Sequence, residues 1–223
     1  MALATHQTSS ATALTVTGSS RLAEELESGL KALVDEYYLD EGLVSRHHSQ
    51  IGCLLDAARC GLPHSPEERT LSPQPWGWRP FLESPDITVG ALTVFADHDI
   101  PLHDHPGSSG LLLVLNGRVQ VTSYRLVGST DTQTQPPLEL EKTSQNVLAP
   151  GDQWRFGPGQ NNIHTLHALD DECEIFDVLF SPYQLQQRSF FMPIVPGTNA
   201  DNLFVVRLNK LRHTTTSHTG PAN

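Results

Sequence analysis

Two stretches in the first third of the chain carry apolar residues at three- and four-residue steps. The apolar positions of the first stretch share one helical face: Leu22, Leu26, Leu30, Leu33 and Tyr37. This spacing predicts an amphipathic helix, with Ser20 as its N-cap. Residues 49–60 repeat the pattern and stop before Gly61, and a capping box over residues 65–68 predicts a short third helix.

After Pro73 the chain changes to short segments in which apolar and polar residues alternate. Residues 87–95 alternate as a half-buried strand does. The apolar run 111–115 ends at Asn116-Gly117, a pair typical of a hairpin turn, and alternation resumes over 119–123. Further strands are expected between Gly151 and Gly157, at 174–180 and at 203–208. About nine short strands predict a mainly β sandwich or barrel, with the helices packed on its outside.

These patterns also predict the domain organisation. Residues 1–19 are rich in Ser, Thr and Ala and predict a disordered tail, as does the segment 213–223. Between them we expect a single domain over 20–212, with a helical part at 20–75 and a β-barrel at 76–212. The length of 223 residues fits one such domain.

Composition narrows the class of partner. The net charge is −11 and no cluster of basic residues appears, which argues against nucleic acid. No apolar run is long enough to predict a membrane span. The first 20 residues contain no charged side chain, so they lack the pattern of a secretory signal. Three cysteines without a C-x-x-C motif favour a reducing compartment. We therefore expect the protein in the cytoplasm, and also in the nucleus. We expect a monomer.

Histidine, with 11 copies, is the candidate for chemistry. His103 and His105 are two residues apart, and in a strand such residues point to the same side. They would form a bidentate platform for a divalent first-row metal, although a bare H-x-H also occurs as two surface histidines. His164 follows a similar Pro/Gly-rich turn, and a β-barrel can bring its strand beside the first pair.

The segment IPLHDHPGSSGLLLVLNGRVQVTSY, residues 100–124, resembles the cysteamine dioxygenase and plant cysteine oxidase family of thiol dioxygenases, which belongs to the cupin superfamily. Asn162-Ile163-His164 and the segment FDVLFSPY, residues 176–183, resemble further motifs of that family. The resemblance covers about residues 22–208. It implies a cupin-type double-stranded β-helix, or jelly-roll barrel, with packed N-terminal α-helices.

The resemblance implies that His103, His105 and His164 bind Fe(2+). The position of the cupin glutamate ligand holds Gly110, so no carboxylate offsets the charge of the metal. Such a site leaves room for a thiolate and for O2. The implied activity is insertion of both oxygen atoms into a thiol to give a sulfinic acid, with cysteamine or the N-terminal cysteine of a peptide or protein as substrate.

Two further residues carry implied catalytic roles. Asp177 either fixes the tautomer of a histidine or binds the substrate amine, since an isolated charge among apolar neighbours is costly; the alternative is a solvated strand aspartate. Tyr183 either donates a hydrogen bond to substrate or oxygen or is a core aromatic residue. His167 is a rival third ligand, but it lies three residues from His164 and would face the other side of a strand.

The chain departs from the family in three places. Arg188 and Phe190 stand where some members carry the cysteine and tyrosine of a cross-link, so that cofactor cannot form there. Ser108 replaces a methionine that follows the HPG motif. These departures keep two alternatives open: a divergent cupin with another metal-dependent reaction, and a binding or regulatory cupin with weakened catalysis.

Overall fold

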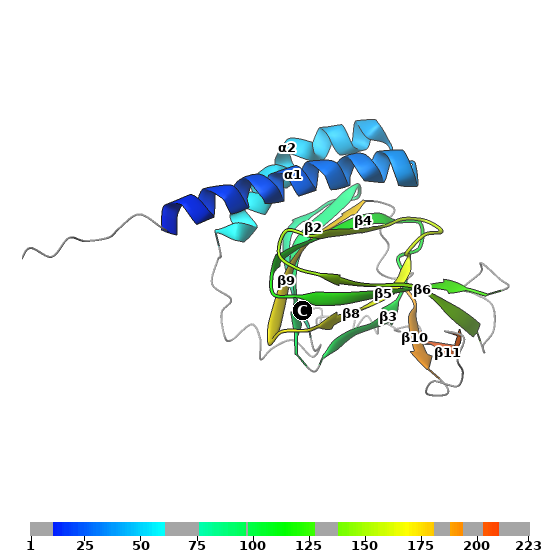
Figure 1. Ribbon diagram of the computed structural model, residues 1–223. Coiled ribbons are helices and arrows are strands. Elements are labelled where there is room, and N and C mark those ends of the chain that lie inside the picture. The colour runs from blue at the N-terminus through cyan, green and yellow to red at the C-terminus, as the bar shows by residue number, and fades with distance from the viewer. Residues whose placement is uncertain are drawn as a thin grey trace, which may run out of the picture.

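The computed structural model describes residues 11–60, 76–96, 98–127, 138–180, 188–193 and 203–209. Two helices and eleven strands lie in these ranges. The helices are α1 (Ala11–Tyr37) and α2 (Glu41–Arg59), and both lie on the outside of the β structure (Figure 1). Neither helix is long and apolar enough to cross a membrane. The predicted third helix, which begins at residues 65–68, and the predicted tail at 213–223 lie outside the described residues.

Both helices begin earlier than predicted. Helix α1 starts at Ala11 and runs through residues 11–19, so Ser20 is not its N-cap. That stretch contains no proline, so backbone hydrogen bonding continues through it despite its polar composition. Helix α2 starts at Glu41 because the side chain of Asp40 accepts a hydrogen bond from the Leu43 N–H at 2.5 Å.

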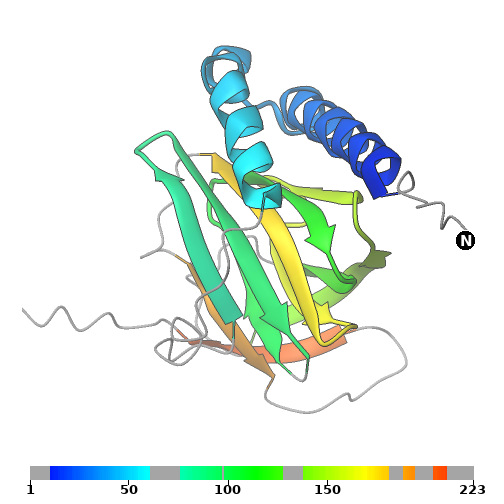
Figure 2. The same ribbon diagram turned by 90° about the vertical axis from the view of Figure 1, so that its left-hand side faces the viewer.

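Five antiparallel strands form the sheet beneath the helices. They are β1 (Trp76–Glu83), β2 (Ile87–Phe95), β4 (Ser109–Asn116), β7 (Gln153–Phe156) and β9 (Glu172–Phe180). Their order across the sheet is β1-β2-β9-β4-β7. Helix α1 contacts β4 and β7, and α2 contacts β2, so the helices cover one face of this sheet (Figure 2).

The remaining six strands form a second antiparallel sheet that closes on itself. They are β3 (Asp99–His103), β5 (Val119–Leu126), β6 (Leu138–Leu148), β8 (Ile163–Ala168), β10 (Phe190–Pro193) and β11 (Leu203–Asn209). Their order is β10-β11-β6-β5-β8-β3, and Phe190 pairs with His103 to complete the ring. The prediction of a mainly β jelly-roll barrel with packed N-terminal helices is confirmed.

The predicted hairpin at Asn116-Gly117 is wrong. Strand β4 pairs with β7 and β9, whereas β5 pairs with β6 and β8, so the turn carries the chain from one sheet to the other. Gly117 has the positive φ of 69° that a tight turn requires. The dipeptide predicts the turn correctly, but local turn chemistry does not specify which strand the chain will pair with.

Alternate residues of the five-stranded sheet enter two separate cores. In β9, Phe176, Val178 and Phe180 pack against the helices together with Leu30 and Leu33 of α1. The intervening Cys173, Ile175 and Leu179 point into the barrel and pack with residues of β5 and β8. Asp177 belongs to this inner face, where it is buried. A charged residue therefore stands among the apolar residues of the barrel interior.

Candidate metal centre

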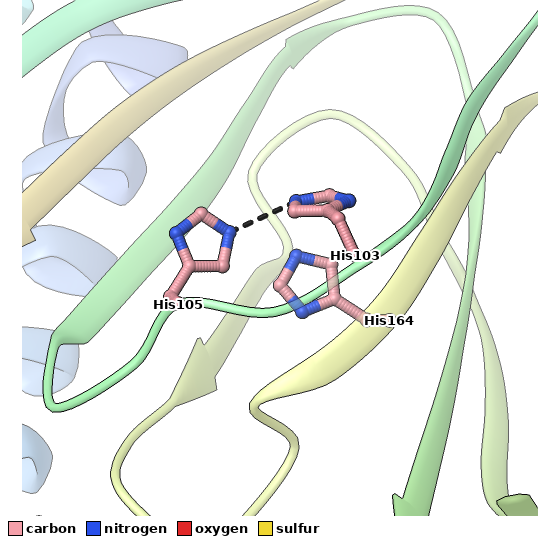
Figure 3. A group of neighbouring side chains, drawn as sticks. All are labelled: His103, His105 and His164. Carbon is pink, nitrogen blue, oxygen red and sulfur yellow. Dashed lines mark hydrogen bonds between the residues drawn. The ribbon is translucent and has the colours of Figure 1, made fainter. Parts of the chain in front are cut away.

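The three predicted metal ligands lie together inside the barrel. His103 ends β3, His164 lies opposite it on β8, and His105 follows two residues after the strand (Figure 3). One nitrogen of each ring lies within 4.8 Å of the others, and all three side chains are buried. In the described part of the chain this is the one group of three metal-ligating side chains so arranged.

Strand alternation does not place His105, because β3 ends at His103. The side chain of Asn162 holds His105 instead. Asn162 Oδ1 accepts the His105 backbone N–H at 2.8 Å, and Asn162 Nδ2 donates to the His105 carbonyl at 2.8 Å. Since Asn162 lies two residues before His164, this pair of hydrogen bonds ties the two histidine segments together. His105 therefore lies beside His103 because of a tertiary contact, and not because both residues belong to one strand.

The hydrogen bonds of the rings indicate their tautomers. His103 Nδ1–H donates to the Pro101 carbonyl at 2.7 Å, and His164 Nδ1–H donates to the Asn161 carbonyl at 3.1 Å. Both rings therefore keep a lone pair on Nε2. His105 differs, because Arg188 Nη2 donates to its Nδ1 at 3.3 Å. Its Nε2 then carries the proton and donates to His103 Nε2 at 2.9 Å (Figure 3).

Burial keeps all three imidazoles neutral. It lowers the pKa of His103 and His105 well below the ordinary value, and the positive charge of Arg188 lowers both further. The pKa of His164 falls to about 4, again chiefly because of burial. A neutral imidazole has the lone pair that a metal needs, so protons compete weakly for these nitrogens at neutral pH.

The rings border a cavity of about 440 Å³. Asp177 reaches it from β9, and its Oδ1 has no hydrogen-bond partner among the described atoms. Burial raises the pKa of Asp177 to about 7, while the nearby Arg188 opposes the rise. The described contacts of the histidine N–H groups run to backbone carbonyls and to His103, so Asp177 is not seen fixing a histidine tautomer. It faces the space where a ligand would lie.

No carboxylate fits where a fourth protein ligand would stand. A Cβ at Gly110 would overlap the ring of Phe156 and lie 3.1 Å from Leu179 Cδ2. The Phe156 ring packs on His105, with ring centroids 4.6 Å apart, and Trp154 meets His164 edge-on at 4.8 Å. The Phe156 ring thus occupies the space that a glutamate side chain at position 110 would need.

Arg188 lies at the cavity, a place that the sequence did not predict. It borders the cavity and contacts His105. The neighbouring Ser189 explains why: its N–H donates to Asp104 Oδ1 at 2.6 Å, and its carbonyl accepts the Asp104 N–H at 3.1 Å. Asp104 is the residue between the two histidines. Its acidic side chain was the one sequence signal that another segment could donate a hydrogen bond at this point. Phe190 also borders the cavity.

The other residues that the sequence singled out do not lie at the metal centre in the described part of the structure. His167 is exposed on β8 and contacts Asp99 at 2.6 Å, facing away from the triad as predicted. His98 contacts the Ala96 carbonyl outside the cavity. Ser108 is buried but is not among the described residues that border the cavity. Tyr183 lies outside the described residues.

The residues present fit a divalent metal ion. Three neutral imidazoles converge, and two of them carry a lone pair on Nε2 while backbone carbonyls hold their Nδ1–H groups. Such second contacts orient imidazole ligands in metal sites. Imidazole suits iron, zinc, copper and nickel alike, so the donor set indicates a metal centre without specifying the element.

Two facing antiparallel sheets with a histidine triad inside them define a cupin-type barrel with a candidate metal centre. The chain belongs to the PCO_ADO family, whose family model matches residues 49–199. This match confirms the resemblance to the cysteamine dioxygenase and plant cysteine oxidase family.

Curated relatives support the same family. The chain is 27% identical over 161 residues to the 2-aminoethanethiol dioxygenase of Homo sapiens, covering 60% of each chain. It is 28% identical over 106 residues to a probable 2-aminoethanethiol dioxygenase of Dictyostelium discoideum, covering 47% of this chain and 48% of the relative. The matched region thus spans about half to three fifths of the length of these relatives.

Among solved structures, the chain resembles an uncharacterised protein with a double-stranded β-helix domain from Klebsiella pneumoniae, with a TM-score of 0.37 and 18% identity. That match covers 54% of this chain and 90% of the other. A cupin-2 domain protein from Shewanella frigidimarina gives a TM-score of 0.34 and 17% identity, covering 55% and 95%. At these scores the assignment rests on the family match and on the sheet topology.

Proposed function

We propose that this chain is an Fe(II)-dependent thiol dioxygenase acting on cysteamine or on the N-terminal cysteine of a peptide. The observation that carries the proposal is the buried triad of His103, His105 and His164 with an aromatic ring in place of a fourth, carboxylate ligand. A member of the PCO_ADO family with this donor set leaves the metal's +2 charge uncompensated by the protein. That charge favours an anionic thiolate as the next ligand.

Iron, when bound by the three histidines, would bring thiolate and dioxygen together and allow them to react. The overall reaction balances without a further reductant. The sulfur loses four electrons, O2 gains four, and both oxygen atoms end on sulfur as a sulfinic acid. No step therefore needs a separate electron donor.

The protein's own residues orient and enclose the reactants. His103 and His164 are held in their tautomers by backbone carbonyls, so their Nε2 atoms point at the reaction site. Phe156 and Trp154 pack against the rings and exclude water from that side. A dry wall strengthens the electrostatic interactions of the site.

Asp177 is assigned to the substrate amine. Its buried carboxyl has an oxygen without a hydrogen-bond partner and borders the cavity, and a primary ammonium supplies up to three N–H donors. The ammonium would lower the pKa of Asp177 from about 7 and hold it ionised. Tyr183 keeps its proposed role as a hydrogen-bond donor to substrate or oxygen. The cytoplasmic location and the monomeric state stay predictions.

One specific observation favours a second candidate. Arg188 and Phe190 border the cavity in place of a cross-linked cysteine and tyrosine. A chain that lacks this cross-link is a candidate for a barrel that binds a thiol without oxidising it. The same assay decides between the two functions, because both predict thiol binding and one alone predicts oxygen uptake.

The full chain is first loaded with Fe(II) under argon. Oxygen consumption is then measured in aerated buffer, with cysteamine and with a Cys-initiating peptide as substrates. We expect uptake of one O2 per thiol and a product heavier by two oxygen atoms in mass spectrometry. His164→Ala should abolish uptake, whereas the exposed His167→Ala should leave it unchanged. Stoichiometric iron without oxygen uptake for either thiol would overturn the proposal and leave the binding function.

A further inference from the structure

Trp78 is an aromatic residue at the cavity that the apolar cores do not use. The described tryptophan and phenylalanine residues that border the cavity are Trp76, Trp78, Phe156 and Phe190. Trp76 and Phe156 pack into the core inside the barrel, and the Phe190 ring lies 5.9 Å from the His103 ring between centroids. Among the described residues Trp78 belongs to none of the cores, and 38% of it is exposed. A large ring in this position is available to contact a ligand.

A glycine allows the Trp78 ring to lie on the inner face of the five-stranded sheet. A Cβ at Gly90 would lie 2.5 and 2.6 Å from two atoms of the six-membered ring of Trp78, Cη2 and Cζ2. Any side chain at position 90 would therefore push this ring away. Because Gly90 has none, the indole of β1 reaches over the backbone of its neighbour β2.

Gly90 also brings the ring close to Asp177. The two residues are direct cross-strand partners in β2 and β9, so their side-chain positions share the inner face. The Cβ positions of such partners are about 4.5–5.5 Å apart. Since the Trp78 ring lies at the Cβ position of Gly90, its nearest edge is roughly one strand spacing from Asp177, about 5 Å. The indole and the carboxyl group thus border the same part of the cavity.

The order of the strands places this pair at one end of the cavity. Asp177 lies on the central strand β9, and Trp78 reaches toward it from β1 on one side. On the other side β7 carries Phe156, whose ring packs on His105, and Arg188 contacts the same histidine. The cavity therefore runs from the histidine centre past Asp177 to Trp78. A thiol with its sulfur at the histidines can extend its other end toward the pair.

A carboxylate beside an indole ring suits an organic cation. The face of an aromatic ring attracts a cation within about 6 Å of its centroid, and tryptophan attracts it most strongly. Asp177 is buried, and its Oδ1 has no hydrogen-bond partner among the described atoms. The carboxylate would supply the opposite charge, and the ring would keep water from the cation. Neither group alone offers both.

We propose that Trp78 and Asp177 together form a cation subsite, in which the indole covers the ammonium group of the bound thiol. Trp78 is then a specificity-determining residue, because it favours cationic thiols over neutral ones of the same shape. Cysteamine and a Cys-initiating peptide both bring such an ammonium group close to their sulfur. The inference rests on the proposed function, because it assumes that the histidine centre is where the sulfur binds.

Anaerobic calorimetry tests the inference apart from turnover. The Fe(II)-loaded full chain is titrated under argon with thiocholine, a thiol with a trimethylammonium group, and with its neutral analogue, in which a tert-butyl group replaces that group. A quaternary nitrogen neither donates a hydrogen bond nor binds a metal, so the comparison reports the ring and the carboxylate. We expect thiocholine to bind roughly ten times more tightly. Equal affinities, or tighter binding of the neutral thiol, would overturn the inference.

Variants at position 78 separate the ring from the carboxylate. The measured quantity is the ratio of the affinities for thiocholine and for its neutral analogue. Trp78→Leu removes the ring and should lower this ratio about 3- to 10-fold, and Trp78→Phe, with a weaker ring, should lower it less. The neutral analogue corrects for lost apolar contact. An unchanged ratio in Trp78→Leu would contradict the assignment.

The matched control is Phe81→Leu. Phe81 lies on the same strand but packs toward the helices, with its ring centroid 6.4 Å from that of Phe176. This variant also removes an aromatic ring from β1, and we expect it to leave the ratio unchanged. A fall equal to that of Trp78→Leu would show that disturbance of the strand causes the loss, and would overturn the role of the indole.

Oxygen uptake, measured in parallel with cysteamine, separates the two proposals. A charge preference that depends on Trp78, without any uptake, would overturn the dioxygenase function and support the cation subsite. Oxygen uptake together with a ratio that is insensitive to Trp78→Leu would do the reverse. A chain that binds none of these thiols would contradict both.

Discussion

Strand β9 of the five-stranded sheet is buried on both faces, and the two faces serve different ends. Toward the helices, β9 presents Phe176, Val178 and Phe180, which pack against apolar residues of α1 and α2. Toward the barrel it presents Ile175, Asp177 and Leu179, and Asp177 has a carboxyl oxygen without a partner. The first face satisfies every rule of a packed core. The second breaks one of them at the residue that borders the cavity.

The comparison shows what a buried polar residue costs and what it provides. Burying a carboxyl group without a partner destabilises a fold, so such a residue is a candidate for a ligand contact. Four predictions test this division, three inside the barrel and one under the helices.

The largest effect should follow from removing a ligand of the candidate metal centre. His103→Ala deletes one of three converging imidazoles, and we expect bound metal to fall at least about tenfold, as measured by elemental analysis after Fe(II) loading and desalting. His167→Ala is the matched control on the neighbouring strand and should retain the metal. Unchanged metal in the His103 variant would refute the ligand assignment and remove the basis of the comparison.

Restoring the missing carboxylate should destabilise the fold. Gly110→Glu would drive a side chain into the Phe156 ring and bury a charge, which costs at least about 4 kcal/mol in free energy of unfolding. Phe156→Ala in the same chain makes room and should recover part of that loss. Chemical denaturation of the wild type and of both variants measures this. A single variant as stable as the wild type would show that the cavity wall is not rigid.

Asp177→Asn should stabilise the metal-free protein at high pH. The pKa of Asp177 in the fold is about 7, above that of the unfolded chain, so the folded state binds more protons between these values and loses stability as pH rises. We expect the variant to be more stable than the wild type by about 4 kcal/mol at pH 8 and similar to it near pH 4. Denaturant titrations at both pH values check this. Asp86→Asn, an exposed residue, is the control, and a difference independent of pH would contradict the prediction.

The smallest effect concerns the helix face and has opposite signs at two glycines. A Cβ on Gly29 of α1 would lie 2.7 Å from Leu111 Cδ1, whereas one on Gly52 of α2 meets nothing within 4 Å. Gly29→Ala should therefore destabilise the protein by about 1 kcal/mol or more, and Gly52→Ala should stabilise it by about 1 kcal/mol. Thermal unfolding measures both. Stabilisation by both variants would show that the helix face is loosely packed.

Much of the fold was predictable because periodicity reports burial directly. The strands predicted at residues 87–95 and 174–180 lie where the pattern predicts them, but β2 is buried on both faces and not half-buried as alternation indicated. The start of α2 was missed although Asp40 is a recognisable cap, because the apolar pattern before residue 49 is weak. The pairing of β4 was predicted wrongly because a turn sequence encodes a reversal of the chain and not the identity of its neighbour.

The candidate site also has a part that the sequence predicts and a part that it does not. His103, His105 and His164 stand out by spacing and by family motif, and the structure brings them together. Their contacts could not be predicted. Asn162 holds His105, and Asp104 docks Ser189, through hydrogen bonds between segments 57 and 85 residues apart in the chain. Spacing along a chain carries no information about such distant partners.

The sequence by itself determined the mainly β class, the helical face around Leu30, the three histidines and the loss of the glutamate at Gly110. The tertiary structure alone decided that Phe156 fills the space of that glutamate, that Asp177 faces the cavity and that Arg188 lies beside His105. The physical reason is the distance along the chain over which each signal acts. Periodicity and motifs report on neighbours within a few residues, whereas the charge and shape of a cavity arise where distant segments pack together.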